Sequence, residues 1–461
     1  MKALDLGSKK VFSTVIKLAV PAMAAQFINV LYSIVDRIYV GNIAEIGDTA
    51  LAAVGVCAPI TTLISSFAFL IGTGGAPLFA MALGEKREER AKEILSNALY
   101  ALAAVAALVA VLTVIFRRPL LMTFGASDET YAFASQYVTI YAAGALFSVT
   151  ATGLNQYVIA QGYSGIGMAT IAVGAAANVA LDPLFIFAFH MDVAGAALAT
   201  VLSQFLSFVF VLLFLLRKST KIRLGLRRFS AKLIGKILRL GISPFLIMAS
   251  DSLIIIASNA VLQSRGGADG DMWITVSTVV QAFFSLITMP MLGISSGTQP
   301  ILSYNYGAKN EETIRRAEKY ITGLCLLFTV LMTIVSLFLA RPFVALFTDT
   351  PLIAEKSVWG IRVFMAGVIP LALQYAFVDG LTGLGQPQYA IFLSLARKLG
   401  VYLTCIFVLP AFWGAEAVFY AEPAADIFSA ILSTCVFLIA FPRILKKRMN
   451  APEEEAQPVK S

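Results

Sequence analysis

Histidine, cysteine and charged side chains are all scarce in this chain of 461 residues. The one histidine is His190, and Cys57, Cys325, Cys405 and Cys435 stand singly in apolar segments without the paired spacing of a metal site. These absences argue against zinc sites and against Ser–His or Cys–His catalysis. We therefore expect no metal centre, no cofactor and no enzymatic activity, and we assign the cysteines to core packing.

Hydrophobic residues make up 59% of the chain, charged residues only 13%, and the mean hydropathy is +0.82. This composition is typical of an integral membrane protein whose main partner is the lipid bilayer. The first apolar stretch runs from Val11 to Val40 without a small-residue cleavage pattern. We expect it to remain in the protein as the first membrane helix.

Apolar runs separated by loop signals predict an all-α protein with twelve transmembrane helices. The predicted spans are about 12–42, 49–83, 92–116, 129–159, 164–190, 194–216, 232–264, 272–305, 314–340, 353–382, 388–410 and 415–441. One side of these spans holds 26 of the 35 Lys and Arg residues. The positive-inside bias makes that side cytoplasmic, places both termini there, and accounts for the net charge of +8 without a nucleic-acid partner.

The chain repeats itself at an offset of 223 residues. Because each half has an even number of spans, the halves share one orientation and form two pseudo-symmetric six-helix bundles. We expect a first bundle over 1–216, a basic cytoplasmic linker over 217–231, a second bundle over 232–442 and a cytoplasmic tail over 443–461. The matching pairs include Pro21/Pro244, Gly74/Gly297, Pro77/Pro300, Gly84/Gly307, Lys86/Lys309, Glu88/Glu311, Gly144/Gly367 and Gly162/Gly385.

Two predicted spans of the first half have a polar stripe with an acidic residue. Asp36 ends a stripe on the first span, and lipid would not tolerate that face, so it must point into the bundle. Asp182 ends a second stripe, which includes Asn178 and precedes Pro183. At about 1.5 Å per residue, Asp36 and Asp182 lie about 28 Å and 24 Å from the cytoplasmic ends of their helices.

Carboxyl groups at similar depth, close together and partly desolvated, are expected to hold a proton or bind a monovalent cation. We therefore predict an ion-coupling site at Asp36, Asp182 and Asn178, occupied by H⁺ or Na⁺. The alternatives are a salt bridge or helix-end interaction for Asp36, with Arg37 as its neighbour, and a packing hydrogen bond of Asp182 at the Pro183 kink.

The second half lacks both acids, since the offset places Asn259 and Cys405 at these positions. Its own acids are Asp251, Asp379, Glu422 and Asp426, which either bind a cationic substrate or second ion, or pair with Arg362, Arg397 or Lys398. Weaker candidates line the predicted cleft, with core filling as the alternative for the methionines. They are Gln26, Asn29, Tyr32, Tyr137, Tyr141, Gln281, Met289 and Met291.

Four stretches resemble one family of transporters. They are "VDRIYVGNI", "GTGGAPLFAMALGEKREE", "NVALDPLFIF" and "GTQPILSYNYGAKNEE", and they are similar to the MATE (multidrug and toxic compound extrusion) family of the MOP flippase superfamily, the last to its MepA-like branch. The resemblance implies a secondary antiporter in a prokaryotic cytoplasmic membrane. It would export amphipathic, often cationic, small organic compounds in exchange for H⁺ or Na⁺ and act as a monomer.

Two other functions compete with this interpretation. A flippase for a lipid-linked or polysaccharide precursor would need basic residues in the cleft to hold a pyrophosphate, yet acids outnumber basic residues there. A membrane enzyme is disfavoured because no nucleophile and base stand in a recognisable motif. ATP binding is disfavoured as well, because the glycine clusters follow no strand and lack the required lysine spacing.

The topology makes a first prediction. Cysteines introduced at Ser219 and Ser461 should resist a membrane-impermeant thiol reagent in intact cells and react once the membrane is opened, because both positions follow basic segments. Labelling of either position from outside would contradict the twelve-span arrangement.

Overall fold

The computed structural model describes residues 3–43, 46–124, 126, 128–218, 220–348 and 350–450, and within them every regular element is a helix. Ser219, Ser461 and most of the predicted tail lie outside the described residues. The α-helices are α1 (Val11–Gly41), α2 (Gly47–Gly84), α3 (Glu88–Ile115), α4 (Arg117–Thr123), α5 (Asp128–Ala143), α6 (Ala145–Ala160), α7 (Ser164–Pro183), α8 (Asp192–Leu216), α9 (Ala231–Gly266), α10 (Gly270–Gly307), α11 (Glu311–Val344), α12 (Pro351–Gly383), α13 (Pro387–Leu395), α14 (Leu403–Trp413) and α15 (Ala421–Met449). The π-helices η1 (Leu184–Ala188) and η3 (Ala396–Tyr402) and the 3₁₀-helices η2 (Gly267–Asp269) and η4 (Ala415–Tyr420) complete the set.

The prediction of an all-α membrane protein is confirmed. Among the described residues, 11 helical segments are long and apolar enough to cross a membrane, and 12 are present if a bent pair counts as one span. That pair, α5 and α6, was predicted as a single helix at 129–159, but the two segments meet at 53°. The bend falls at Gly144, where a Cβ would lie 2.4 Å from Val201 of α8.

The sequence repeat is also a structural repeat. At the offset of 223 residues, the bounds of α2 coincide with those of α10, and the bounds of α5 and α6 together coincide with those of α12. The helix ends match in detail, because the N–H of Arg87 bonds to the carbonyl of Ala82 and the N–H of Asn310 to that of Asn305, both at 2.9 Å. The residues with positive φ that make these turns also pair, as Lys86 with Lys309 and Gly162 with Gly385.

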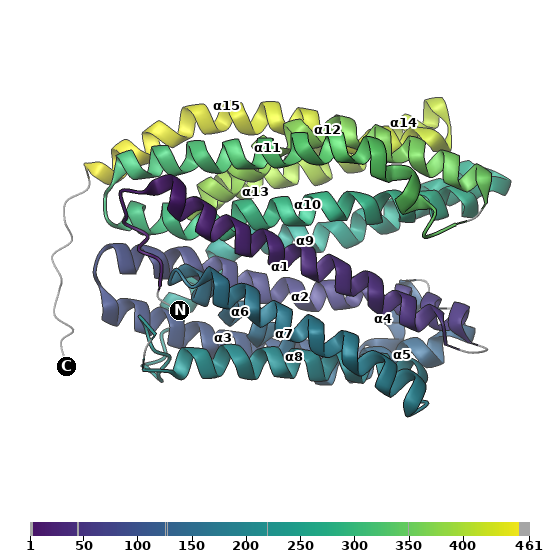
Figure 1. Ribbon diagram of the computed structural model, residues 1–461, viewed down its shortest axis with the longest axis horizontal. Coiled ribbons are helices and arrows are strands. Elements are labelled where there is room, and N and C mark those ends of the chain that lie inside the picture. The colour runs from purple at the N-terminus through teal and green to yellow at the C-terminus, as the bar shows by residue number, and fades with distance from the viewer. Residues whose placement is uncertain are drawn as a thin grey trace.

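The two halves contact each other through their first two helices. In Figure 1 the helices α10 to α15 lie above α2 to α8, with α1 and α9 between them. α1 packs against α10, and its repeat partner α9 packs against α2. Accordingly, Leu18 of α1 belongs to the core of the second half, and Ile237 of α9 to the core of the first.

Glycines allow the halves to approach closely where α2 and α10 end. A Cβ on Gly84 would lie 1.9 Å from the carbonyl oxygen of Tyr304, and a Cβ on Gly307 would lie 2.2 Å from that of Met81. These two contacts are related by the same offset of 223 residues. The end of the helices at which α2 and α10 finish is therefore a tight, pseudo-symmetric crossing of the two halves.

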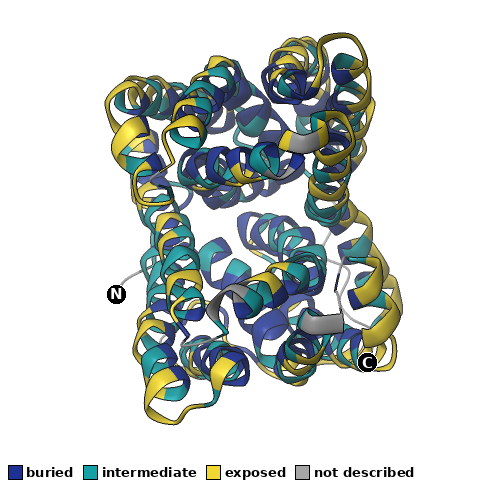
Figure 2. Cartoon of the chain, turned by 90° about the vertical axis from the view of Figure 1, so that its right-hand side faces the viewer, coloured by how far each residue is buried: buried dark blue, intermediate teal, exposed yellow. Residues whose placement is uncertain are grey.

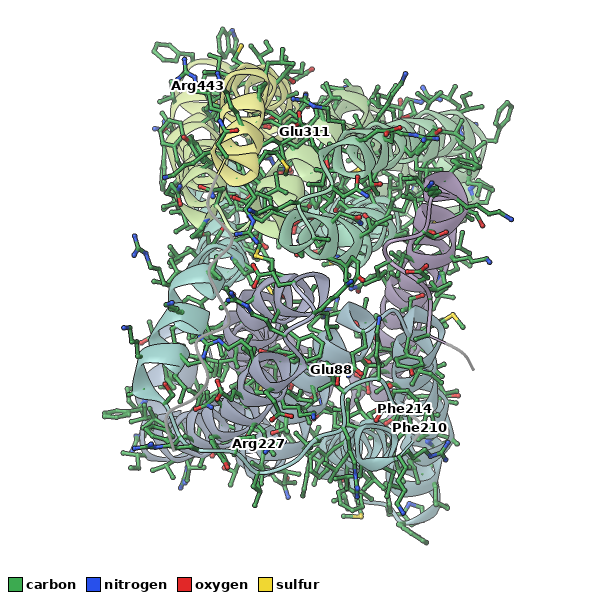
Figure 3. The ribbon with its side chains drawn as sticks, turned by 90° about the vertical axis from the view of Figure 1, so that its left-hand side faces the viewer. Glu88, Phe210, Phe214, Arg227, Glu311 and Arg443 are labelled. Carbon is green, nitrogen blue, oxygen red and sulfur yellow. The ribbon has the colours of Figure 1, made fainter. Side chains whose placement is uncertain are left out.

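This crossing lies at the end of the molecule rich in lysine and arginine, which we call the basic end. Figure 3 looks onto it, with Glu88 and Glu311 in different halves. Arg448 of α15 donates to the carbonyls of Tyr306 and Gly307 and to the carboxylate of Glu85, so the end of the second half is tied to the first.

The basic segment 217–231, predicted as a solvated connector, is docked on the first half. Ser230 N–H donates to Asn97 Oδ1 at 2.7 Å, and Arg227 N–H donates to Ser96 Oγ at 2.9 Å. The charges along this segment concealed a set of specific backbone hydrogen bonds to α3.

Large apolar side chains are exposed along the outside of the helices. Phe338, Leu346 and Phe412 are 73%, 81% and 75% exposed, and many others exceed half exposure. Figure 2 shows these exposed positions on the outer faces and the buried ones inside each group of helices. A water-soluble protein would not leave so much apolar surface uncovered, whereas lipid covers it without cost.

The packing of α9 on α2 generates a prediction. A Cβ on Gly241 would lie 1.7 Å from the carbonyl oxygen of Leu70. Gly241→Ala should therefore lower the free energy of unfolding by about 1–3 kcal/mol, the usual cost of overpacking. The matched control is Gly235→Ala on the same helix, where nothing lies within 4 Å. Unfolding in detergent would contradict the interpretation if both variants behaved alike.

Candidate functional site

The carboxyl groups of Asp36 and Asp182 lie within hydrogen-bonding reach of each other. α1 and α7 pack together and bring the two side chains to the same depth, as the sequence predicted. Asp182 is fully buried, while Asp36 is partly buried. No described residue hydrogen-bonds to Oδ1 of Asp36 or to Oδ2 of Asp182. The pair therefore has free acceptor oxygens in an apolar bundle.

Asn178 completes this group through the helical repeat of α7. Its Nδ2 donates to Oδ1 of Asp182, four residues later, at 3.2 Å, and lies 3.5 Å from Oγ1 of Thr200 on α8. Asn178 is 2% exposed, and its own Oδ1 has no partner among the described residues. Three helices, α1, α7 and α8, thus converge on the carboxyl pair.

Three tyrosines close the group. Tyr137 and Tyr141 of α5 are buried and stacked, with ring centroids 6.3 Å apart. The Tyr32 hydroxyl lies within electrostatic range of Tyr141, Asp36 and Asp182, and Tyr137 within range of Asp36. The aromatic rings separate the acids from water while leaving hydroxyl groups nearby.

The remaining weak candidates have separate surroundings. Asn29 donates to Gln26 at 3.3 Å on the same helix, and both are half-buried. Gln281 donates to Ser277, one turn earlier on α10, at 3.0 Å. Met291 is fully buried in the core of the second half, which is the packing alternative that the sequence left open.

The acids of the second half pair with basic residues, the other alternative that the sequence left open. Arg397 donates to Glu422 at 2.5 Å and to Asp426 at 2.6 and 2.9 Å, and all three side chains are at most 7% exposed. Lys398 donates to Asp251, whose side chain remains 49% exposed. Both basic residues belong to the π-helix η3. Its wider turn places consecutive cations against α15 and α9.

A buried acid that the sequence analysis missed lies on α11. Glu318 is 4% exposed, and neither of its carboxylate oxygens has a partner among the described residues. Its neighbour is Asp379 of α12. The available signal was the helical distance of Glu318 from the helix start, but its surroundings "EETIRRAEKY" are typical of a solvated face.

The first carboxyl pair suits a small exchangeable cation. Asp36 Oδ1, Asp182 Oδ2 and Asn178 Oδ1 are buried oxygens without donors, and oxygen donors are the ligands that protons and hard monovalent cations accept. Among the described residues, no group of three or more His, Cys, Asp and Glu side chains can hold a metal ion. The arrangement binds one positive charge rather than a structural transition metal.

Two repeated six-helix halves with buried, exchangeable acids define a membrane transport protein. The chain belongs to the MATE family of transporters, because the family model MatE matches residues 21–184 and again 244–405, once in each half. This confirms the family to which the sequence motifs pointed.

Relatives across nearly the whole chain agree with this assignment. The multidrug export protein MepA of Staphylococcus haemolyticus (strain JCSC1435) is 24% identical over 436 residues, which cover 94% of this chain and 93% of that protein. The MepA protein of Staphylococcus aureus (strain NCTC 8325 / PS 47) is 23% identical over 439 residues, 94% of this chain and 95% of that one. These relatives are transport proteins, so the chain is not an enzyme.

Solved structures share the fold. An outward-facing multidrug resistance MATE family transporter of the MOP superfamily superposes with a TM-score of 0.89 at 23% identity, covering 97% of this chain and 99% of that one. A MOP superfamily transporter from Pyrococcus furiosus gives the same TM-score, identity and coverage. The two pseudo-symmetric bundles predicted from the sequence are thus the MATE fold.

The buried ion cluster makes a stability prediction. Arg397→Met leaves Glu422 and Asp426 without an opposite charge, so it should lower the free energy of unfolding by about 3–5 kcal/mol. Arg315→Met, which breaks the exposed pair with Glu311, should cost about 1 kcal/mol or less. Unfolding of the purified protein in a denaturing detergent compares the two, and equal losses would contradict a buried electrostatic role.

Proposed function

We propose that this protein is a multidrug efflux antiporter that exports amphipathic, mainly cationic, organic compounds in exchange for H⁺ or Na⁺. The observation that supports this most directly is the contact between Asp36 and Asp182, with Asn178 beside them. The names of the relatives, which are multidrug export proteins, agree with the substrate class.

The coupling follows from charge balance at the pair. Two carboxylates in contact in a bundle of low polarity repel each other, so the pair is stable only with a proton or a cation bound. An ion shifts a conformational equilibrium only if it binds the two conformations unequally. Exchange at Asp36 and Asp182 therefore provides the means by which an ion gradient drives the halves between orientations.

The proposed substrate cleft lies beside this site. On α1, Gln26, Asn29 and Tyr32 occupy the helix face that leads to Asp36. In the second half, the half-exposed carboxylate of Asp251 is available to attract a cation, whereas Glu422 and Asp426 are buried against Arg397. A flippase for an anionic precursor would need free basic groups, and Arg397 and Lys398 are already paired with acids.

We further propose that both termini and the basic end are cytoplasmic, in a prokaryotic cytoplasmic membrane. The proposed divisions are a first bundle over 1–216, a linker over 217–231, a second bundle over 232–442 and a tail over 443–461. One chain contains both halves and the carboxyl pair, so a monomer is sufficient for the transport cycle.

The central test is Asp36→Asn in proteoliposomes. The amide keeps the shape of the side chain but cannot exchange a proton or neutralise a cation. Efflux of a fluorescent organic cation, driven separately by a pH gradient and by a Na⁺ gradient, should fall to the rate measured without any gradient. Binding of the compound to the purified variant should persist.

The matched control is Glu355→Gln, which removes an exposed acid from α12 and should transport as the wild type does. The gradient that energises the wild type identifies the coupling ion. Gradient-driven efflux by Asp36→Asn near the wild-type rate would overturn the proposed role of the pair.

A further inference from the structure

Glu318 of α11 is a buried carboxyl group without hydrogen-bond partners. It is 4% exposed, and both oxygens lack a partner among the described residues. The carboxyl group sits against the backbone of α12, where a Cβ on Gly380 would lie 2.8 Å from Oε1 and 2.9 Å from Oε2. The missing side chain of Gly380 creates the space that holds it.

The residue before Gly380 is Asp379, whose carboxyl group has a different environment. Ser295 Oγ donates to Asp379 Oδ2 at 2.5 Å, and Gln299 Nε2 donates to Oδ1 at 2.9 Å. Both donors come from α10, so each oxygen of Asp379 receives one hydrogen bond. Hydrogen bonds to a carboxylate stabilise its ionised form.

The contrast between the two acids assigns the charges. A carboxylate at Glu318 would be buried with no donor and next to the negative charge of Asp379, which is the costliest arrangement for an ionised group. A protonated Glu318 removes both penalties. We propose that Glu318 and Asp379 form a second proton-binding site, in which Glu318 holds the proton and Asp379 the negative charge.

No positive charge offers another solution. Among the described residues, neither Glu318 nor Asp379 has a Lys or Arg ion-pair partner, and the next titratable group is Cys325 on α11. α10 contributes only the neutral Ser295 and Gln299. α1, which also packs on α11, contributes an aromatic contact of Phe12 with Tyr320. A proton is therefore the simplest occupant that neutralises the pair.

The site communicates with the contact between the halves. Gln299, the donor to Asp379, also lines a narrow pocket formed by α2, α6 and α10, together with Thr73, Gln156 and Ser296. Thr73 and Ser296 are related by the repeat, and Gln156 is the repeat partner of Asp379. A polar route thus runs from the interface of the halves to Asp379.

This site is separate from the pair proposed for ion coupling. Glu318 lies near the start of α11 and Asp379 near the end of α12, both at the basic end, whereas Asp36 lies near the opposite end of α1. The first half has no counterpart, because the offset places Leu95 and Gln156 at the equivalent positions. The protein then has one carboxyl pair near each end, in opposite halves.

Infrared spectroscopy of the purified full-length protein tests the assignment, because a protonated carboxyl group has a C=O stretching band that a carboxylate lacks. At neutral pH, Glu318→Gln should lose about one carboxyl equivalent from this band relative to the wild type. Asp379→Asn should lose none, because Asp379 is ionised. Glu312→Gln, an exposed acid on the same helix paired with Arg316, is the matched control and should also lose none.

An unchanged band in Glu318→Gln, or a band lost in Asp379→Asn, would overturn the proposal. If Glu318→Gln does not fold, Glu318→Leu provides the residue found at the equivalent position of the first half, and it must lose the same band. The spectrum is recorded without substrate or gradient. A failure of the proposed antiport would therefore leave this result unaffected, and the reverse also holds.

Discussion

The requirement that each buried charge be neutralised explains how this chain arranges its interior. The spans are apolar outside and tightly packed inside, so an ionised side chain must find an opposite charge, several donors or a proton. The second half uses the first solution at Arg397, which lies between Glu422 and Asp426. Asp36 and Asp182 have no such partner, and their charge must be balanced by an ion from solution.

These two solutions have different functional consequences. A buried arginine keeps its charge, so its cluster fixes α15 against η3 in every step of a cycle. A carboxyl pair changes its net charge when a proton or cation leaves, and the energy of the conformation that buries it changes with it. The permanent pairs therefore stabilise one rigid half, while the exchangeable pairs provide sensitivity to an ion gradient.

The close crossing of α2 and α10 determines where such a change is transmitted. Gly84 and Gly307 bring backbone against backbone at the basic end, and Arg448 joins the same region through Glu85 and the carbonyls that end α10. α1 and α9 each pack into the other half. Movement of α1 at Asp36 is therefore coupled mechanically to the second half, without a separate transmitting element.

Sequence reasoning was sufficient for the fold and for the first carboxyl pair. Helical spacing and depth along two spans placed Asp36 beside Asp182, because both quantities follow from the geometry of a straight helix. The bend at Gly144 was missed because its identical repeat partner, Gly367, lies inside the unbroken α12, so local sequence alone does not decide between the two outcomes. The choice between pairing and binding at Glu422 also required tertiary structure.

Glu318 shows why the remaining part of the site was hidden. Its neighbours in sequence are charged and solvated, and only the packing of α11 on α12 reveals that this one carboxyl group points inward against Gly380.

The repeat shows how two similar halves acquire different roles. Their helices superimpose in length and in the turns that end them, yet every buried charge discussed above is present in one half alone. Arg397 and Glu422 of the second half correspond to Gly174 and Ala199 of the first, just as Asp182 of the first corresponds to Cys405 of the second. The shared framework supplies symmetric packing, so that the halves can rock against each other. The unshared charges make the two sides of that motion energetically unequal, which a gradient must find in order to drive transport in one direction.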